Sequence, residues 1–138
     1  LGFIEHFNNV DAVVECHLSW LKPGGLLILG VPNFSHLNGL VQKILNKSIL
    51  DQHNTDIMNT KYFHHIADKF NLGTEFVGYL GSFEPVMFIG DQNAPNRLQF
   101  IINISLNILK KIRKIKFFDS LNSHLFSSYI LSVYRKTE

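Results

Sequence analysis

Residues 21–33 read LKPGGLLILGVPN, and this stretch decides the fold. The proline and two glycines at 23–25 predict a tight turn. The unbroken apolar run from Leu26 to Val31 then predicts a strand that is buried on both faces, as in a parallel sheet. Pro32 ends this strand because proline has no N–H for a sheet ladder. Ligands bind beyond the carboxyl ends of strands in open α/β sheets, so we expect residues 33–36 to lie at a functional edge.

The segment before this turn predicts the end of a strand followed by a helix. Residues 1–4 are apolar and give way to Glu5 and His6, as when a buried strand emerges into a loop. Asn8 is placed to cap the helix that follows. The apolar residues at helical spacing on it are Val10, Val13, Val14, Leu18 and Leu21. These elements together predict a βαβ unit with neighbouring parallel strands and a right-handed crossover.

Residues 3–7 (FIEHF), this helix and residues 21–33 together resemble the second half of a class I S-adenosylmethionine-dependent methyltransferase of the type 11/12-like group. In that family a Glu-His pair commonly closes the fourth strand, and a Leu-Lys-Pro-Gly-Gly turn opens the fifth. The resemblance covers about residues 1–79, and the last strand more loosely. It implies an α/β fold, the C-terminal part of a Rossmann-like sheet with flanking helices. That sheet is expected to be mixed and mostly parallel, with an antiparallel last strand inserted between the fifth and sixth strands.

The rest of the chain predicts further helices and strands. Helical spacing predicts a helix of two to three turns around residues 37–45 and another over 60–70, capped by Thr60 and terminated near Gly73. Strands are expected at 74–79 and 127–134. An apolar patch at 86–89, between glycines and prolines, is consistent with a short extra strand or a hairpin arm.

The resemblance implies S-adenosylmethionine as the cofactor, and Gly2 and Phe3 as the residues of this chain that contact it. The family's glycine-rich turn is missing, however, because no Gly-x-Gly pattern occurs in the 138 residues. We therefore expect residues 1–138 to be a single partial methyltransferase domain, the C-terminal half of a longer protein, inactive alone. A sheet edge exposed by the missing half predicts a homodimer, a domain swap or a complementing chain.

Candidate catalytic residues lie where the first two predicted strands end. Glu5 and His6 should flank one crevice with Asn33, and a histidine there can act as the general base of methyl transfer. Alternatively, Glu5 and His6 only anchor the loop through hydrogen bonds. His36 and His53 are, with Asn33, the predicted substrate contacts. The polar stretch at 47–59, which contains His53, often covers the substrate in the family, and its alternative interpretation is a solvated loop.

The sequence predicts no metal site. No two histidines stand at the helical spacing of metal ligands, and adjacent His64 and His65 point about 100° apart on a helix. The single Cys16 permits neither a cysteine cluster nor an internal disulfide. The acceptor is expected to be a small molecule, a saccharide or a lipid-linked compound, but no residue indicates its identity or the atom that is methylated.

Composition excludes several classes of protein. Apolar residues make up 46% of the chain, as in a globular core, and the net charge of +2 is too small to predict nucleic-acid binding. There is no uncharged apolar run of membrane-spanning length and no signal peptide, so a cytoplasmic location is expected.

One segment carries clustered positive charge. Residues 98–118 predict an amphipathic helix whose second half is basic. Its basic residues are Lys110, Lys111, Arg113, Lys114 and Lys116, and its apolar side holds Ile101, Ile104, Ile108, Ile112 and Ile115. We expect this helix to pack on the sheet. The alternative function is a non-catalytic binding module that docks this helix on a membrane surface or on nucleic acid.

Overall fold

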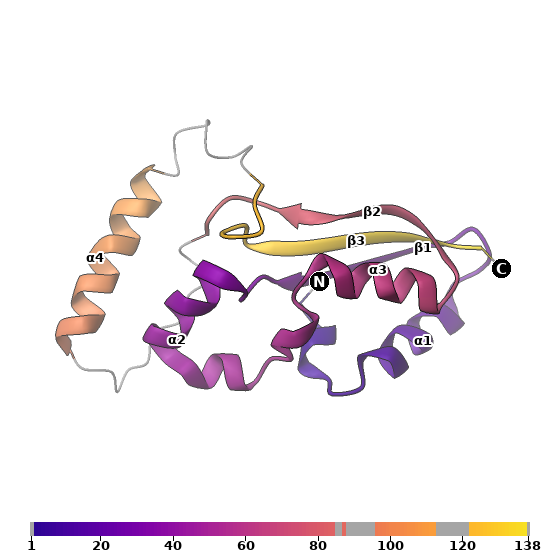
Figure 1. The fold of residues 1–138 in the computed structure, drawn as a ribbon, viewed down its shortest axis with the longest axis horizontal. Helices are drawn as coiled ribbons and strands as arrows, with labels where there is room; N and C mark the ends of the chain where they lie inside the picture. The colour runs from indigo at the N-terminus through magenta and orange to yellow at the C-terminus, as the bar shows by residue number, and fades with distance from the viewer. Residues whose placement is uncertain (1, 85–86, 88–95, 113–121, 138) are drawn as a thin grey trace.

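The computed structural model describes residues 2–84, 87, 96–112 and 122–137. Three strands form one sheet, with helices along one of its faces and toward one end of the molecule (Figure 1). The strands are β1 (Leu26–Pro32), β2 (Leu72–Leu80) and β3 (Tyr129–Lys136). The α-helices are α1 (Val10–Trp20), α2 (His36–Asp51), α3 (Thr60–Lys69) and α4 (Asn96–Ile112). Two short 3₁₀ helices are η1 (Ile4–His6) and η2 (Thr55–Ile57).

The sheet has the order β1-β3-β2, and β3 is antiparallel to both neighbours. The prediction that the last strand lies antiparallel between the two preceding strands is therefore confirmed. The prediction of a mostly parallel sheet is wrong for the described strands, because β3 separates the only two that run in the same direction. A parallel pair would need a further strand at the free edge of β1 or of β2.

Residues 2–7 do not form the expected strand. Residues 4–6 of this segment form η1. One backbone hydrogen bond, from the Gly2 N–H to the Gly30 carbonyl at 2.8 Å, joins the segment to β1. Among the described residues before α1 there is thus no strand, so the predicted βαβ unit is not formed there. The reason lies in the turn before η1, where Gly2 adopts a left-handed φ of 70° that breaks an extended course.

The turn that opens β1 is formed as predicted. Gly24 has a φ of 77°, which suits the third position of a type II turn after Pro23. A Cβ on Gly25 would lie 2.8 Å from the Lys22 carbonyl oxygen, so only glycine fits there. Both glycines are thus required to lead α1 directly into β1.

The core lies on one face of the sheet, under α1 and α3. Val14 of α1, Phe63 of α3 and Tyr134 of β3 are fully buried there. On the other face, Ile28 of β1 is 55% exposed. Phe76 of β2, which lies in the same row across the sheet, is 42% exposed. The expectation that β1 is buried on both faces is therefore wrong for its first half. No described strand pairs with the outer edge of β1, and self-association through that edge stays a prediction.

The helix ends differ from the predicted ones by one or two residues. Asn9 caps α1 in place of Asn8, its side chain accepting from the Ala12 N–H at 3.2 Å. Asn59 caps α3 in place of Thr60. In each case the asparagine one position away offers the better-placed oxygen. After α3 ends at Lys69, the left-handed residue of the turn is Asn71, whose φ is 50°. Gly73, the predicted terminator, belongs to β2.

Helix α2 is longer than predicted and reaches Asp51, with a non-helical residue at Asn46. Helix α4 lies beside α2 at one end of the molecule and does not pack on the sheet, contrary to the prediction (Figure 1). Leu106 of α4 packs against Leu45 of α2. Residues 113–118 of the predicted helix, and the predicted strand at 86–89 apart from Met87, lie outside the described residues. Within the described part of the chain, no helix has the length and apolarity to cross a membrane.

One buried tyrosine, Tyr134, and one partly buried tyrosine, Tyr62, predict a loss of stability in alkali. Burial, aided by the nearby Asp11 carboxylate, raises the pKa of Tyr62 to about 12, and burial raises the pKa of Tyr134 to about 12. Both exceed the ordinary value of about 10. The free energy of unfolding should therefore be fully present below pH ~10 and fall as the pH rises from ~10 to ~12.

Urea unfolding at pH values below, within and above this interval measures the effect. The double variant Tyr62→Phe, Tyr134→Phe is expected to show a weaker decline than the native chain. An equal decline in both proteins would contradict the assignment to these tyrosines.

Candidate functional site

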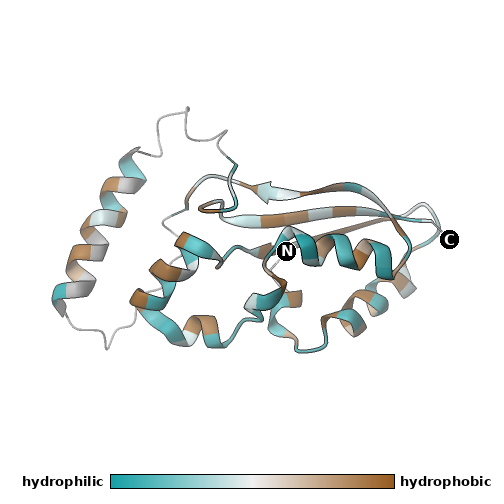
Figure 2. Ribbon diagram, viewed as in Figure 1, coloured by the Kyte–Doolittle hydropathy of each residue, from teal (hydrophilic) through white to brown (hydrophobic). Residues whose placement is uncertain are grey.

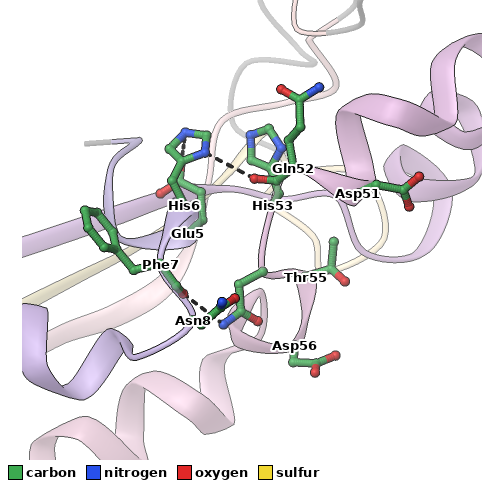
Figure 3. A pocket seen from close by; sticks show the side chains of 10 residues that line it. Glu5, His6, Phe7, Asn8, Asp51, Gln52, His53, Thr55 and Asp56 are labelled. Carbon is green, nitrogen blue, oxygen red and sulfur yellow. Dashed lines mark hydrogen bonds and ion pairs between the residues drawn. The ribbon is translucent and has the colours of Figure 1, made fainter.

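A polar cavity of about 340 Å³ lies between the N-terminal segment and the end of α2 (Figure 3). Residues 5–8, which contain the end of η1, form one wall. Residues 51–56, from the end of α2 into η2, form the other. Segments far apart in the sequence thus meet at this cavity.

The centre of the cavity wall is formed by Glu5, His6 and His53. Each can offer one ligand atom such that these atoms lie within 4.8 Å of one another. The two imidazole rings lie next to each other, with their centroids 4.6 Å apart (Figure 3). The Glu5 side chain is only 2% exposed, whereas that of His6 is 47% exposed. The site therefore combines a buried carboxylate with an accessible imidazole.

Backbone groups orient both histidines. His6 Nδ1 lies 3.3 Å from the Gln52 carbonyl oxygen, and His53 Nδ1 lies 2.6 Å from the Ile49 carbonyl oxygen. With Nδ1 donating to these carbonyls, Nε2 of each ring keeps its lone pair. The Nε2 of His6 lies 3.9 Å from Glu5 Oε1. Each ring therefore keeps one nitrogen that is able to take a proton or bind a cation.

Asn54 holds the two walls together. Its N–H donates to the Glu5 carbonyl at 2.6 Å, and its side-chain Nδ2 donates to the Phe7 carbonyl at 3.3 Å. The sequence indicated a polar stretch here but not this link, because nothing local predicts a bond across 47 or more positions. Gln52 orients His6 through its backbone carbonyl, so the identity of its side chain could not have indicated this contact.

Two of the predicted substrate contacts lie outside this cavity. Asn33 is fully buried and its Nδ2 donates to the carbonyls of His124 and Ser127, at 3.3 and 2.8 Å. Its Oδ1 accepts from Ser35. The side chain of Asn33 therefore fastens the end of β1 to the segment before β3.

His36 lines a second hollow of about 500 Å³, beside α2, which shares Asp51 and Thr55 with the first. Its ring lies edge-on to that of His124, with centroids 5.1 Å apart. Of the three predicted substrate contacts, the structure thus brings only His53 next to Glu5 and His6.

The predicted cofactor residues, Gly2 and Phe3, lie at the start of the described chain. The Gly2 N–H already donates to Gly30, and a Cβ on Gly2 would meet Glu5 Oε1 at 3.6 Å. Phe3 is half-exposed, and its ring packs against Phe7 with centroids 4.9 Å apart. Contact of Gly2 and Phe3 with S-adenosylmethionine therefore stays a prediction.

Comparison with known proteins gives a likeness of fold. No family model and no curated protein matches this chain. Among solved structures, a SAM-dependent methyltransferase from Archaeoglobus fulgidus matches with a TM-score of 0.55 and 14% sequence identity. The match covers 98% of this chain and 56% of that one, so the chain spans little more than half the length of that structure. The chain thus shares the fold of part of a SAM-dependent methyltransferase.

Proposed function

We propose that this chain supplies the acceptor side of an S-adenosylmethionine-dependent methyltransferase. The observation that supports this is the polar cavity with Glu5, His6 and His53, set in a fold shared with such an enzyme. Since the chain has no glycine-rich turn, the proposal includes a longer polypeptide that provides the cofactor side. This longer polypeptide is called the parent polypeptide below.

In this proposal His6 acts as the general base. The cofactor supplies an activated methyl group, so the protein mainly has to align the acceptor and take up the proton that it loses. His6 is accessible from the cavity, and its Nε2 has a free lone pair when Nδ1 donates to Gln52. Glu5 lies 3.9 Å from that nitrogen, where its charge stabilises the imidazolium that forms.

The lining of the cavity favours an acceptor with hydroxyl groups. Asp51, Thr55 and Asp56 add oxygen atoms to the wall that carries His53. Such groups accept or donate hydrogen bonds to hydroxyls, which fits a saccharide or another polar small molecule. We therefore propose His53 as a contact to the acceptor rather than as a second base.

The test is a methyl-transfer assay with cofactor labelled in the methyl group. The parent polypeptide is incubated with hydroxylated small molecules, saccharides and lipid-linked saccharides, and labelled product is counted. We expect product with the parent polypeptide and none with residues 1–138 alone. Absence of product from every acceptor class with the parent polypeptide would contradict the proposal.

A second candidate function rests on α4. Phe100, Ile101, Ile104 and Ile108 are exposed on this helix, between 43% and 65%, and two lysines, Lys110 and Lys111, follow in its last turn. Figure 2 shows that apolar residues recur along the whole helix. An apolar face beside positive charge suits an anionic membrane surface. We propose membrane docking through α4 as the alternative function.

Co-sedimentation with vesicles checks this alternative. Vesicles that contain anionic lipid should pull down the chain at low salt, and binding should weaken at high salt. The variant Ile104→Ser, Ile108→Ser should lose binding, whereas Ile28→Ser, on the exposed sheet face, should keep it. Equal binding to neutral vesicles, or no binding to either kind, would remove membrane docking.

A further inference from the structure

We propose that Glu5, His6 and His53 bind a divalent transition-metal ion. The sequence predicted no metal site because it offered no cysteine cluster and no helical histidine pair. The structure brings three ligand groups together from η1 and from the segment after α2, within 4.8 Å of one another. Two imidazoles and one carboxylate are a ligand set that zinc and iron sites use.

The first argument for an ion is an unpartnered buried oxygen. Glu5 is 1% exposed, and its Oε2 has no hydrogen-bond partner. Burial of a carboxylate without a partner is costly, and a fold retains one where something compensates it. The distance of 3.9 Å from Oε1 to His6 Nε2 is too long for a hydrogen bond. A cation at the cluster would supply the missing interaction.

The second argument is the arrangement behind the ligands. Histidines that bind metal usually donate their other ring N–H to a backbone carbonyl or a carboxylate, which fixes the ring and its tautomer. His6 and His53 both do this, toward Gln52 and Ile49. Both rings are therefore oriented with Nε2 free, as metal ligation needs.

The third argument is that the two ligand-bearing segments are joined. Asn54 bonds to the carbonyls of Glu5 and Phe7, and the ring of Phe34 packs edge-on against His53 at 5.4 Å between centroids. Tetrahedral ligands about 2.0–2.1 Å from zinc lie roughly 3.4 Å apart. Small rotamer changes would thus close the cluster around an ion while the backbone stays in place.

The ligand set favours zinc over calcium or magnesium. Those two ions prefer six or more oxygen ligands, whereas imidazole nitrogen suits first-row transition metals. With three protein ligands, one coordination position stays open toward the cavity. If the proposed methyl transfer is correct, an ion there would lower the pKa of an acceptor hydroxyl bound at that position, and the hydroxyl would lose its proton to water. Because Nε2 of His6 cannot bind an ion and take up a proton at the same time, His6 would act as the base in the metal-free protein, and a bound ion would activate the acceptor in its place.

Calorimetric titration of residues 1–138 with Zn²⁺ tests the site. The titration uses a Cys16→Ser background, because an exposed thiol can bind zinc alone. We expect one ion per chain, and His6→Gln and His53→Gln should each weaken binding by at least about 100-fold. The matched control is His17→Gln, because His17 Nδ1 bonds to the Val13 carbonyl at 2.7 Å just as His53 bonds to Ile49. This control should bind zinc as the background does.

A third variant separates metal binding from folding. Glu5→Gln keeps the shape of the side chain and removes the buried charge, so it should weaken zinc binding without lowering the thermal midpoint of the metal-free chain. Co²⁺ added to the Cys16→Ser protein should give the visible absorption bands of a four-coordinate ion. These bands should be lost when Glu5→Gln is added. The site is overturned if no zinc binds, or if Glu5→Gln and His53→Gln bind it as tightly as the background does. Zinc binding by a parent polypeptide without methyl transfer would instead overturn the proposed function alone.

Discussion

Tyr134→Ala is expected to lower the free energy of unfolding by about 3–5 kcal/mol, the cost of removing a buried aromatic ring from a packed core. Tyr134 is the largest fully buried side chain in the described part of the chain, and it lies on the central strand, opposite Leu27 of β1 and Thr74 of β2. Its hydroxyl donates to the Phe63 carbonyl of α3 at 2.6 Å. One side chain therefore joins all three strands to the helix that covers them. Urea unfolding followed by circular dichroism measures the loss.

Two further variants divide this effect into its parts. Tyr134→Phe removes only the hydrogen bond and should cost about 0.5–1.5 kcal/mol. Tyr129→Ala is the matched control, because Tyr129 lies on the same strand but is 43% exposed. It should change stability by less than about 1 kcal/mol. Equal losses for Tyr129→Ala and Tyr134→Ala would show that the core does not lie between the sheet and α3.

His6→Gln in the parent polypeptide is expected to reduce the turnover number for methyl transfer by about 10²–10⁴-fold, the usual contribution of a general base. Glutamine is close to histidine in size, but its amide does not take up a proton at neutral pH. His53→Gln should instead raise KM more than it lowers the turnover number, because His53 is proposed to contact the acceptor. Steady-state kinetics at saturating cofactor distinguishes these two effects.

The control for both variants is His17→Gln, which lies on α1 outside the cavity and should leave both kinetic constants unchanged. Full turnover in His6→Gln would contradict the catalytic assignment. It would favour the other interpretation of the sequence, in which Glu5 and His6 only anchor the loop. Circular dichroism of each variant shows whether a loss of activity is a loss of fold.

Much of the sheet could be predicted from local sequence, since turn chemistry and apolar runs act over short distances. The turn at Gly24 and Gly25 and the strand that follows it are where local sequence predicts them. The antiparallel last strand is also as expected, but that expectation came from the resemblance to methyltransferases. The expected parallel neighbour of β1 is not among the described strands, because residues 4–6 form η1. The position of α4 was missed for a different reason. Its apolar side fits burial against α2 as well as against the sheet, and helical spacing does not distinguish the two.

The candidate site shows the same division between local and distant contacts. The sequence singled out Glu5, His6 and His53, each from its own neighbourhood. That they meet depends on the bonds from Asn54 to Glu5 and Phe7, which link segments that no local pattern connects. Asn33 was expected to flank the same crevice, but its side chain is buried outside the cavity. It donates to the carbonyl of Ser127, 94 residues further along the chain, a contact that no local pattern indicates.

The most direct test of the account is calorimetric titration with S-adenosylhomocysteine, the product that methyltransferases release. It is carried out on residues 1–138 and on the parent polypeptide, with circular dichroism to show that each is folded. The account predicts no binding to residues 1–138 and one molecule bound per parent polypeptide. Binding to residues 1–138 alone would mean that the cofactor site is built without a glycine-rich turn. A folded parent polypeptide that binds none would contradict the methyltransferase proposal itself.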